Sequence, residues 1–190
     1  MIDTNIELPK SYSEIKIDSE RISFSMPYDL QTGSFLRTLV ATKKDGHFLE
    51  IGTGTGLSLS WMVEGMSENS TLITIDNSSE YQSVAKKHIQ NPNISFICED
   101  AENWILNYND SKFDLIFADA WPGKYSVLEE TLNLLNSSGI YLIDDMLPQP
   151  NWPKDHEKNV EILIQNLENR KDIQLTKMRW STGLILITKK

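Results

Sequence analysis

The chain has 190 residues and a mass of 21.8 kDa, which suits one domain rather than two. Hydrophobic residues at 39% and charged residues at 24% exclude a disordered or fibrous protein and are typical of a chain with a buried core. The 27 acidic and 18 basic residues give a net charge of −9, which repels phosphate backbones and anionic membrane surfaces. We therefore expect neither a nucleic-acid nor a membrane partner.

The cysteine content and the first residues indicate a compartment. Cys98 is the single cysteine and has no intramolecular disulfide partner, and no stretch approaches the ~18 apolar residues of a membrane span. Residues 1–7 lack the basic start and the apolar run of a secretory signal. We therefore expect a cytoplasmic protein.

The predicted elements alternate between strands and helices. Residues 1–29 are a polar lead segment, interpreted as a lid or a tail, and a helix is predicted over 30–41. Short apolar runs predict strands, buried on both faces, at 47–51, 71–76, 94–98, 113–118 and 139–143. The remaining predicted helices are 57–66, 78–90, 101–107, 124–135 and 155–169, with Asn77 and Asp155 as N-caps of the helices near 78 and 155. This alternation is typical of βαβ units around a parallel sheet.

The end of the chain departs from this alternation. The β-prone segments 172–178 and 182–188 have no helix between them, which predicts an antiparallel hairpin at one sheet edge. The proline-rich loop 147–153 is interpreted either as a connector or as a wall of the active site.

A glycine-rich segment, Glu50-Ile-Gly-Thr-Gly-Thr-Gly56, runs from a predicted strand into a predicted helix. Glycine permits positive φ and lets a ligand approach the backbone, and the helix N-terminus offers free N–H donors. The dinucleotide fingerprint is G-x-G-x-x-G, whereas Gly52, Gly54 and Gly56 alternate here. A carboxylate at Glu50 repels a pyrophosphate but attracts the cationic amino-acid end of S-adenosylmethionine. The segment therefore favours S-adenosylmethionine over NAD.

Acidic residues follow the next two strands. Asp76 ends the second strand, where a carboxylate can accept hydrogen bonds from both ribose hydroxyls of a nucleoside; the alternative is a charge at a helix N-terminus. Asp100 follows the third strand, where it can meet an adenine amino group. It can instead cap the helix that starts at Ala101, with Glu99 or Glu102 as the ligand.

With Asp119 after the fourth strand, these motifs resemble the class I S-adenosylmethionine-dependent methyltransferases over residues 30–190. The resemblance implies an α/β fold: a three-layer Rossmann-like methyltransferase fold with a seven-stranded, mostly parallel sheet, an antiparallel C-terminal strand and helices on both faces. It implies a single methyltransferase domain, 1–190, with a lid or tail at 1–29 and a cofactor-binding core at 30–190. The implied cofactor-binding residues are Glu50, Gly52, Thr53, Gly54, Gly56, Ser58, Asp76, Asn77, Asp100, Ala101 and Asp119.

The segments 113–125 and 139–145 resemble the catechol and caffeoyl-CoA type of small O-methyltransferase, a group that includes bacterial O-methyltransferases. In that group, the positions of Asp119, Asp144 and Asp145 hold a divalent metal, so the resemblance implies Mg²⁺ or another divalent cation. Such a cation would lower the pKa of a substrate hydroxyl and orient its oxygen. The alternative is that Asp144 and Asp145 cap the following loop through its backbone.

Two positions depart from that group. Pro122 replaces its lysine general base and Ala120 replaces the adjacent histidine, which argues against catechol chemistry while leaving methyl transfer intact. Lys124, two residues further on, is the catalytic candidate with Asp119; its alternative is a solvated surface lysine. The histidines show no ligand spacing and are interpreted as surface or structural residues, although His156 stands out because it follows the proline-rich loop.

Aromatic residues follow the same strands. Trp104 is a candidate to pack on adenine, while Trp121, Trp152 and Trp180 are candidates to wall an acceptor pocket; core packing is the alternative for each.

The sequence thus predicts an S-adenosylmethionine-dependent methyltransferase that acts on the hydroxyl of a small-molecule acceptor, with or without a divalent cation. The alternatives are a noncatalytic S-adenosylmethionine-binding module and an NAD-dependent oxidoreductase, and a homodimer is left open. Six acidic residues are expected to converge on one rim as a field suited to a sulfonium cation: Glu50, Asp76, Asp100, Asp119, Asp144 and Asp145.

Overall fold

A single sheet runs through the computed structural model, which describes residues 3–26, 29–149 and 152–190. Within these residues, seven strands are arranged in the order β3-β2-β1-β4-β5-β7-β6. Their bounds are β1 His47–Ile51, β2 Thr71–Asp76, β3 Ile94–Cys98, β4 Phe113–Ala118, β5 Leu135–Ile143, β6 Ile173–Met178 and β7 Leu184–Lys189. The pairs among β1 to β5 are parallel, and β7 is antiparallel to both β5 and β6. The predicted fold class and C-terminal hairpin are confirmed.

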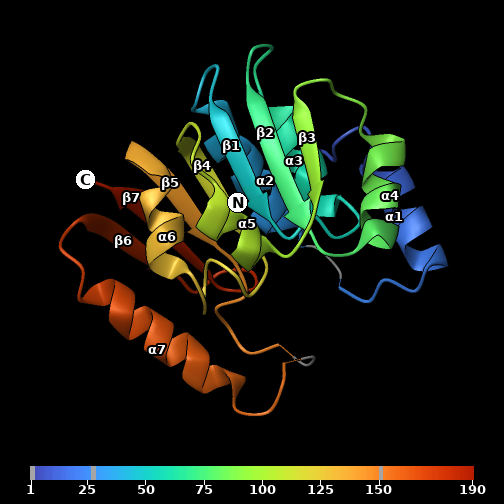
Figure 1. The fold of residues 1–190 in the computed structure, drawn as a ribbon. Helices are drawn as coiled ribbons and strands as arrows, with labels where there is room; N and C mark the ends of the chain where they lie inside the picture. The colour runs from blue at the N-terminus through green and yellow to red at the C-terminus, as the bar shows by residue number, and fades with distance from the viewer. Residues whose placement is uncertain (1–2, 27–28, 150–151) are drawn as a thin grey trace.

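Helices cover both faces of the sheet (Figure 1). Their bounds are α1 Tyr12–Arg21, α2 Leu30–Ala41, α3 Leu57–Gly65, α4 Ser79–His88, α5 Ala101–Asn107, α6 Leu128–Asn133 and α7 His156–Glu168. Side chains alternate along each strand, so Phe48 packs with α1 to α4, whereas Leu49 packs with α5 to α7. Val160, Leu163 and Leu167 form the buried stripe of α7.

The region after β4 differs from the prediction of a helix over 124–135. Gly123 and Val127 have φ values of 84° and 48°, so the chain turns twice before α6 begins at Leu128. The fifth strand begins at Leu135, four residues before the predicted start at 139. The turn at Gly123 and Val127 matters for the site because it sets the direction of the side chains between these two residues, including Lys124.

Three smaller expectations also need correction. Ser78 rather than Asn77 caps α4, since its side chain accepts a hydrogen bond from Tyr81 N. Asp155 is at the N-cap of α7 as predicted, but its backbone is left-handed and its side chain makes no capping bond. Strand β3 is only partly buried, because it lies at the edge of the sheet.

The lead segment contains a helix that the sequence reasoning missed. In α1, Ile15 is fully buried and Tyr12 packs edge-on against Trp61 of α3, with ring centroids 5.8 Å apart. Helix α1 therefore belongs to the packed core of its face of the sheet. Across the described ranges, every helix is too short or too polar to cross a membrane.

Candidate functional site

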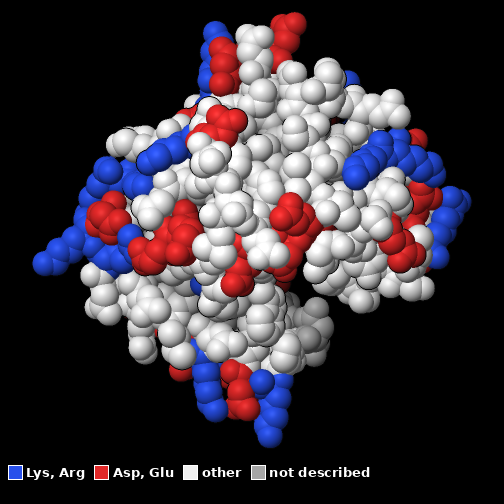
Figure 2. Space-filling model, viewed as in Figure 1, with Lys and Arg blue, Asp and Glu red and all other residues white. Residues whose placement is uncertain are grey.

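The order of strands reverses between β1 and β4, and the loops that follow these two strands meet there. Asp119 N donates to Ile51 O at 3.0 Å. Gly52 has a φ of 102°, and a Cβ at this position would lie 3.1 Å from Asp119 O. Only glycine fits without strain, so the glycine-rich loop and the end of β4 form one closely packed rim. Figure 2 shows acidic side chains near the middle of this view, while basic side chains lie mostly toward its edges.

Asp76 is held in place by the backbone on both sides. Its Oδ2 accepts a hydrogen bond from Gly54 N at 2.8 Å, and its Oδ1 accepts one from Ser78 N at 2.8 Å. The carboxylate thus joins the glycine-rich loop to the start of α4. Because Asp76 is only half-buried, its free lone pairs remain available to hydroxyl donors of a ligand. The adjacent Asn77 is exposed.

Glu50 is fully buried at the carboxyl end of β1. Its two carboxyl oxygens accept hydrogen bonds from Ser58 Oγ at 2.6 Å and from Thr74 Oγ1 at 2.5 Å. Burial raises the pKa of Glu50 to about 8, the two hydroxyls oppose this rise, and the charge of Asp76 adds to it. At neutral pH, Glu50 is therefore mainly the neutral acid, which differs from the charged carboxylate that the sequence analysis placed in the site.

Two polar residues behind the glycine-rich loop, Thr74 and Gln82, were not identified from the sequence. Thr53 Oγ1 lies 2.6 Å from Thr74 Oγ1, and Gln82 Nε2 donates to Thr53 Oγ1 at 3.2 Å and to Ile97 O at 2.7 Å. A threonine inside the apolar run 71–76 is a weak signal for such a role, whereas Gln82 gives none. Together these contacts fix the loop from beneath and connect it to β2 and α4.

In this structure Asp100 caps helix α5, which was the alternative to contacting an adenine. It is exposed, and its side chain caps α5 by accepting a hydrogen bond from Asn103 N at 3.0 Å. Ala101 is buried at the start of α5. Trp104 stacks on Tyr108 with ring centroids 4.4 Å apart. The contacts of Asp100, Ala101 and Trp104 with an adenine therefore stay predictions.

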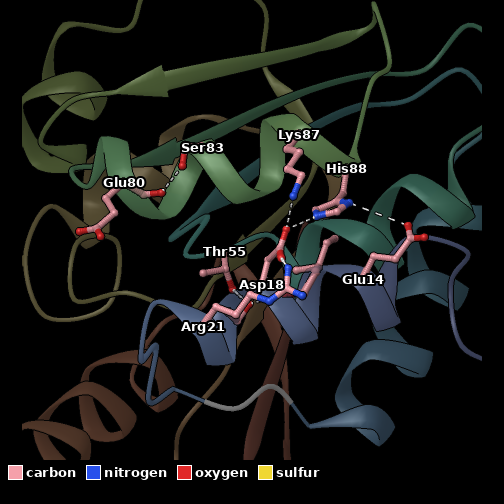
Figure 3. A network of polar contacts seen from close by, with 10 residues as sticks. Glu14, Asp18, Arg21, Thr55, Glu80, Ser83, Lys87 and His88 are labelled. Carbon is pink, nitrogen blue, oxygen red and sulfur yellow. Dashed lines mark hydrogen bonds and ion pairs between the residues drawn. The ribbon is translucent and has the colours of Figure 1, made fainter.

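Helix α1 lies alongside α4, and side chains of the two helices point toward one another (Figure 3). Asp18 accepts hydrogen bonds from Lys87 Nζ at 2.5 Å and pairs with His88 Nε2 at 2.8 Å. These two contacts hold the pKa of Asp18 well below its usual range. On the inner side of α1, Ser19 Oγ donates to Thr55 Oγ1 at 2.7 Å, which ties the helix directly to the loop.

The segment after α1 covers the same loop. The Phe24 ring lies edge-on to Tyr81, with centroids 4.9 Å apart. A Cβ at Gly54, whose φ is 49°, would lie 3.0 Å from the tip of the Phe24 ring. Nothing in the polar pattern of residues 1–29 signals this contact, and it puts an aromatic side chain directly against the proposed cofactor loop.

The carboxylates after β4 and β5 form the other half of the rim. Asp144 is buried, whereas Asp119 and Asp145 are partly buried. Burial, and then the charge of Asp144, raises the pKa of Asp119 well above its usual value, and the charge of Lys124 opposes this. Burial also raises the pKa of Asp144 to about 6, although a hydrogen bond from Thr182 opposes the rise.

Lys124 is buried among these acids rather than solvated, with 4% of its surface exposed. Its Nζ donates to the backbone oxygen of Asp144 at 2.9 Å. The turn after β4 directs it inward, because Tyr141 Oη donates to Gly123 O at 2.7 Å and Lys124 N donates to Trp121 O at 3.1 Å. The structure thus places Lys124 at the ends of β4 and β5, where its charge acts on Asp119 and Asp144, and its catalytic role stays a prediction.

The three aspartates named as metal ligands do not fit a metal ion in this arrangement. In the described part of the chain, no three His, Cys, Asp or Glu side chains come together as ligands for one ion. Asp144 Oδ1 instead accepts hydrogen bonds from Thr182 Oγ1 and from Asp145 N. Mg²⁺ needs a near-octahedral set of oxygen ligands. The alternative prediction, in which Asp144 and Asp145 cap the loop after β5 through its backbone, describes Asp144 better.

An aromatic cluster adjoins this end of the rim. Trp121, Tyr125 and Trp152 surround His156, with ring centroids 5.2, 5.0 and 4.7 Å from the imidazole. Tyr125 Oη and His156 Nδ1 are buried and have no hydrogen-bond partner among the described residues. Trp180 lies apart from the cluster and packs on Phe35. Residues 150–151 of the proline-rich loop lie outside the described residues.

Comparisons with known proteins agree with this geometry. A model of the O-methyltransferase family matches residues 10–190. A curated protein of Mycobacterium sp. (strain KMS), named as an O-methyltransferase, is 31% identical over an alignment of 117 residues, and the match covers 58% of this chain and 53% of the relative. The chain therefore spans about half the length of the curated relatives that it matches.

Solved structures share the whole fold at low sequence identity. The O-methyltransferase from Bacillus cereus, solved in complex with SAH, has a TM-score of 0.84 at 20% identity, over 99% of this chain and 94% of that one. TomG, an O-methyltransferase from Streptomyces achromogenes solved with SAM, has a TM-score of 0.84 at 18% identity, over 98% and 92% of the two chains. At these identities the likeness establishes the fold alone.

Proposed function

The chain belongs to the O-methyltransferase family, and we propose that it transfers the methyl group of S-adenosylmethionine to a hydroxyl oxygen of a small molecule. The observation that carries this proposal is the rim where β1 and β4 diverge, with a glycine-rich loop on one side and Asp119 on the other. Ligands of open α/β sheets bind at such a reversal of strand order.

The cofactor would be held by the carboxyl ends of β1, β2 and β3. Asp76, fixed by Gly54 N and Ser78 N, is oriented to accept hydrogen bonds from the ribose hydroxyls. The loop Gly52–Gly56 permits close approach of the amino-acid part, with Glu50 and Ser58 beneath it. We assign the adenine to the start of α5, at Asp100 and Ala101. The remaining proposed contacts are Thr53, Asn77 and Asp119.

The acceptor would meet the cofactor beside Asp119 and Lys124. When bound, S-adenosylmethionine supplies a methyl group on a sulfonium, which passes to the acceptor oxygen and leaves a neutral thioether. The hydroxyl proton must leave at the same time, and we assign its uptake to Asp119, whose pKa is raised by burial and by Asp144. Lys124 offsets the negative charge around it. The proposed reaction includes no divalent cation, because the aspartates do not fit one.

The aromatic cluster Trp121, Tyr125, Trp152 and His156 supports an acceptor with a planar ring. Exposed indole surface at Trp121 offers a stacking face, and the unpartnered Tyr125 Oη and His156 Nδ1 offer a polar anchor. A small molecule is favoured over nucleic acid by the net charge of −9. A cytoplasmic location is the accompanying proposal, supported by the single unpaired cysteine.

Isothermal titration with S-adenosylmethionine and with its demethylated product tests the cofactor assignment. We expect both to bind, and we expect Asp76→Asn to weaken binding by about tenfold or more, since a charge-assisted hydrogen bond contributes about 1.5–3 kcal/mol. Asp45→Asn is the matched control, because Asp45 is exposed and lies at the opposite end of β1. If neither ligand binds the wild-type protein, the proposed function is wrong.

Turnover separates an enzyme from a noncatalytic binding module. Release of the demethylated product would be measured with a panel of phenols and aliphatic alcohols. Asp119→Asn should lower kcat by a larger factor than it lowers cofactor affinity, since Asp119 is the proposed proton acceptor and only one of several proposed cofactor contacts. Cofactor binding without turnover on any member of the panel would favour the noncatalytic module.

A further inference from the structure

Lys124 is a buried cation in a site where its family relatives were expected to have a metal. Placing an ammonium out of water is costly unless nearby negative charge and hydrogen bonds compensate. Here the compensation comes from the ends of β4 and β5: Asp144 O accepts a hydrogen bond at 2.9 Å, and the carboxylates of Asp119 and Asp144 interact with its charge.

The backbone turn around Lys124 is tightly packed and directs this side chain into the interior. Gly123 has a φ of 84°, and a Cβ there would lie 2.9 Å from Tyr141 Oη and 3.0 Å from the Ile51 side chain. The same Tyr141 hydroxyl donates to Gly123 O, and Pro122 forms a bridge with Ser126. A solvated lysine on a regular helix would need none of these constraints.

One of the carboxylate oxygens that a cation would use, Asp144 Oδ1, is engaged elsewhere. Asp144 Oδ1 is bonded to the hydroxyl of Thr182 and to the backbone N–H of Asp145. Asp145 has a left-handed backbone, with a φ of 62°. The described residues therefore contain the negative charge of a cation site without its ligand geometry.

We propose that the Lys124 ammonium takes the place of a divalent cation at this rim, so that the protein balances the charge of Asp119, Asp144 and Asp145 from within its own chain. The relevance of this charge balance to methyl transfer rests on the proposed function, but the charge balance itself does not. A divalent cation and the Lys124 ammonium would repel each other across this small space, so the site accepts one or the other.

Titration with Mn²⁺, followed by electron paramagnetic resonance of the free ion, tests the exclusion directly. We expect the wild-type protein to show no saturable binding up to about 1 mM, the upper range of weak protein sites for divalent ions. Lys124→Met removes the charge and keeps most of the side-chain volume. It should bind Mn²⁺ at least about tenfold more tightly than wild type, because three carboxylates are then left without their internal cation.

Lys154→Met is the matched control, since Lys154 is exposed outside the rim, and it should behave as wild type. Should Lys124→Met be unfolded without metal, the same titration is read by circular dichroism, and the proposal then requires Mn²⁺ to restore the folded signal. Tight Mn²⁺ binding to wild type that Asp144→Asn abolishes would overturn the proposal. So would a Lys124→Met variant that gains no affinity and no metal-dependent folding.

The titration needs no cofactor, so its outcome is separate from that of the proposed function. A protein that fails to bind S-adenosylmethionine or its product, yet excludes Mn²⁺ until Lys124 is removed, would refute the function and support the charge balance. Turnover that stops in excess chelator and returns with Mn²⁺ would support the function and refute the charge balance.

Discussion

Replacement of Glu50 by glutamine provides a quantitative test of the buried acid. Burial raises the pKa of Glu50 from 4.5 to about 8, and both hydroxyl partners remain compatible with an amide. A carboxyl group whose pKa is higher in the folded state favours folding while it is protonated. Its contribution is fully present below the unfolded value of 4.5 and is lost as pH rises through 8.

The size of the effect follows from the two pKa values. Each unit of difference corresponds to about 1.4 kcal/mol, so the contribution of Glu50 to the free energy of unfolding should fall by about 3–4 kcal/mol between about pH 5 and pH 8. In Glu50→Gln this group does not titrate. The variant should therefore be similar to wild type at pH 5 and more stable than wild type at pH 8.

Urea unfolding at several pH values, followed by tryptophan fluorescence, measures this difference, since Trp61 is fully buried and reports loss of the core. Glu64→Gln is the control for the same chemical change at an exposed position of α3. Other titrating groups affect wild type and variant alike, so the difference between their profiles isolates Glu50. Profiles that run parallel from pH 5 to pH 8 would refute the buried neutral acid.

Two further predictions concern the lead helix and the aromatic cluster. Ile15→Ala should lower the free energy of unfolding by about 2–5 kcal/mol, because Ile15 is fully buried. Asp18→Asn should lower it far less, since Lys87 and Arg21 are exposed and water screens their charges; urea titrations of both variants decide whether packing or the ion network holds α1. Trp121→Ala should raise KM for an aromatic acceptor and leave cofactor affinity unchanged, as steady-state kinetics and calorimetry would show. A larger loss of unfolding free energy for Asp18→Asn than for Ile15→Ala would contradict the first assignment. Equal losses of acceptor and cofactor affinity in Trp121→Ala would contradict the second.

The fold was predictable because its signals are local. Apolar runs and the helical stripe of α7 are read over a few residues, and four of the five predicted parallel strands match the observed bounds. The exceptions have nonlocal causes. Helix α1 is polar along most of its length and is recognised only through what it packs on, and α6 starts late because Val127 adopts a left-handed backbone that the sequence pattern does not signal.

The sequence predicted which strand ends carry the acidic residues of the site, but not which of these residues make structural contacts instead of being free to bind a ligand. Asp76 and Asp119 lie at the carboxyl ends of β2 and β4, as the motif spacing indicated, whereas Lys124 is held inward by a turn instead of starting the predicted helix. Whether Asp100 binds a ligand or caps a helix depends on a backbone distance that the sequence does not contain. The contact of Phe24 with the glycine-rich loop joins segments 30 residues apart by way of a turn with no recognisable motif.

The electrostatic character of the rim changes most when burial is considered. Formal charges place up to six negative residues there, but burial raises the pKa of Glu50, Asp119 and Asp144. At neutral pH the expected field is therefore reduced chiefly at Glu50, whose pKa is about 8, and Lys124 offsets part of the charge of Asp119 and Asp144. A cationic ligand lowers the pKa of acids beside it, so its arrival would create the charge that attracts it and release protons. Binding of a sulfonium cofactor should thus be coupled to proton release, which titrations in buffers of different ionisation enthalpy would measure; heats that do not depend on the buffer would contradict this coupling.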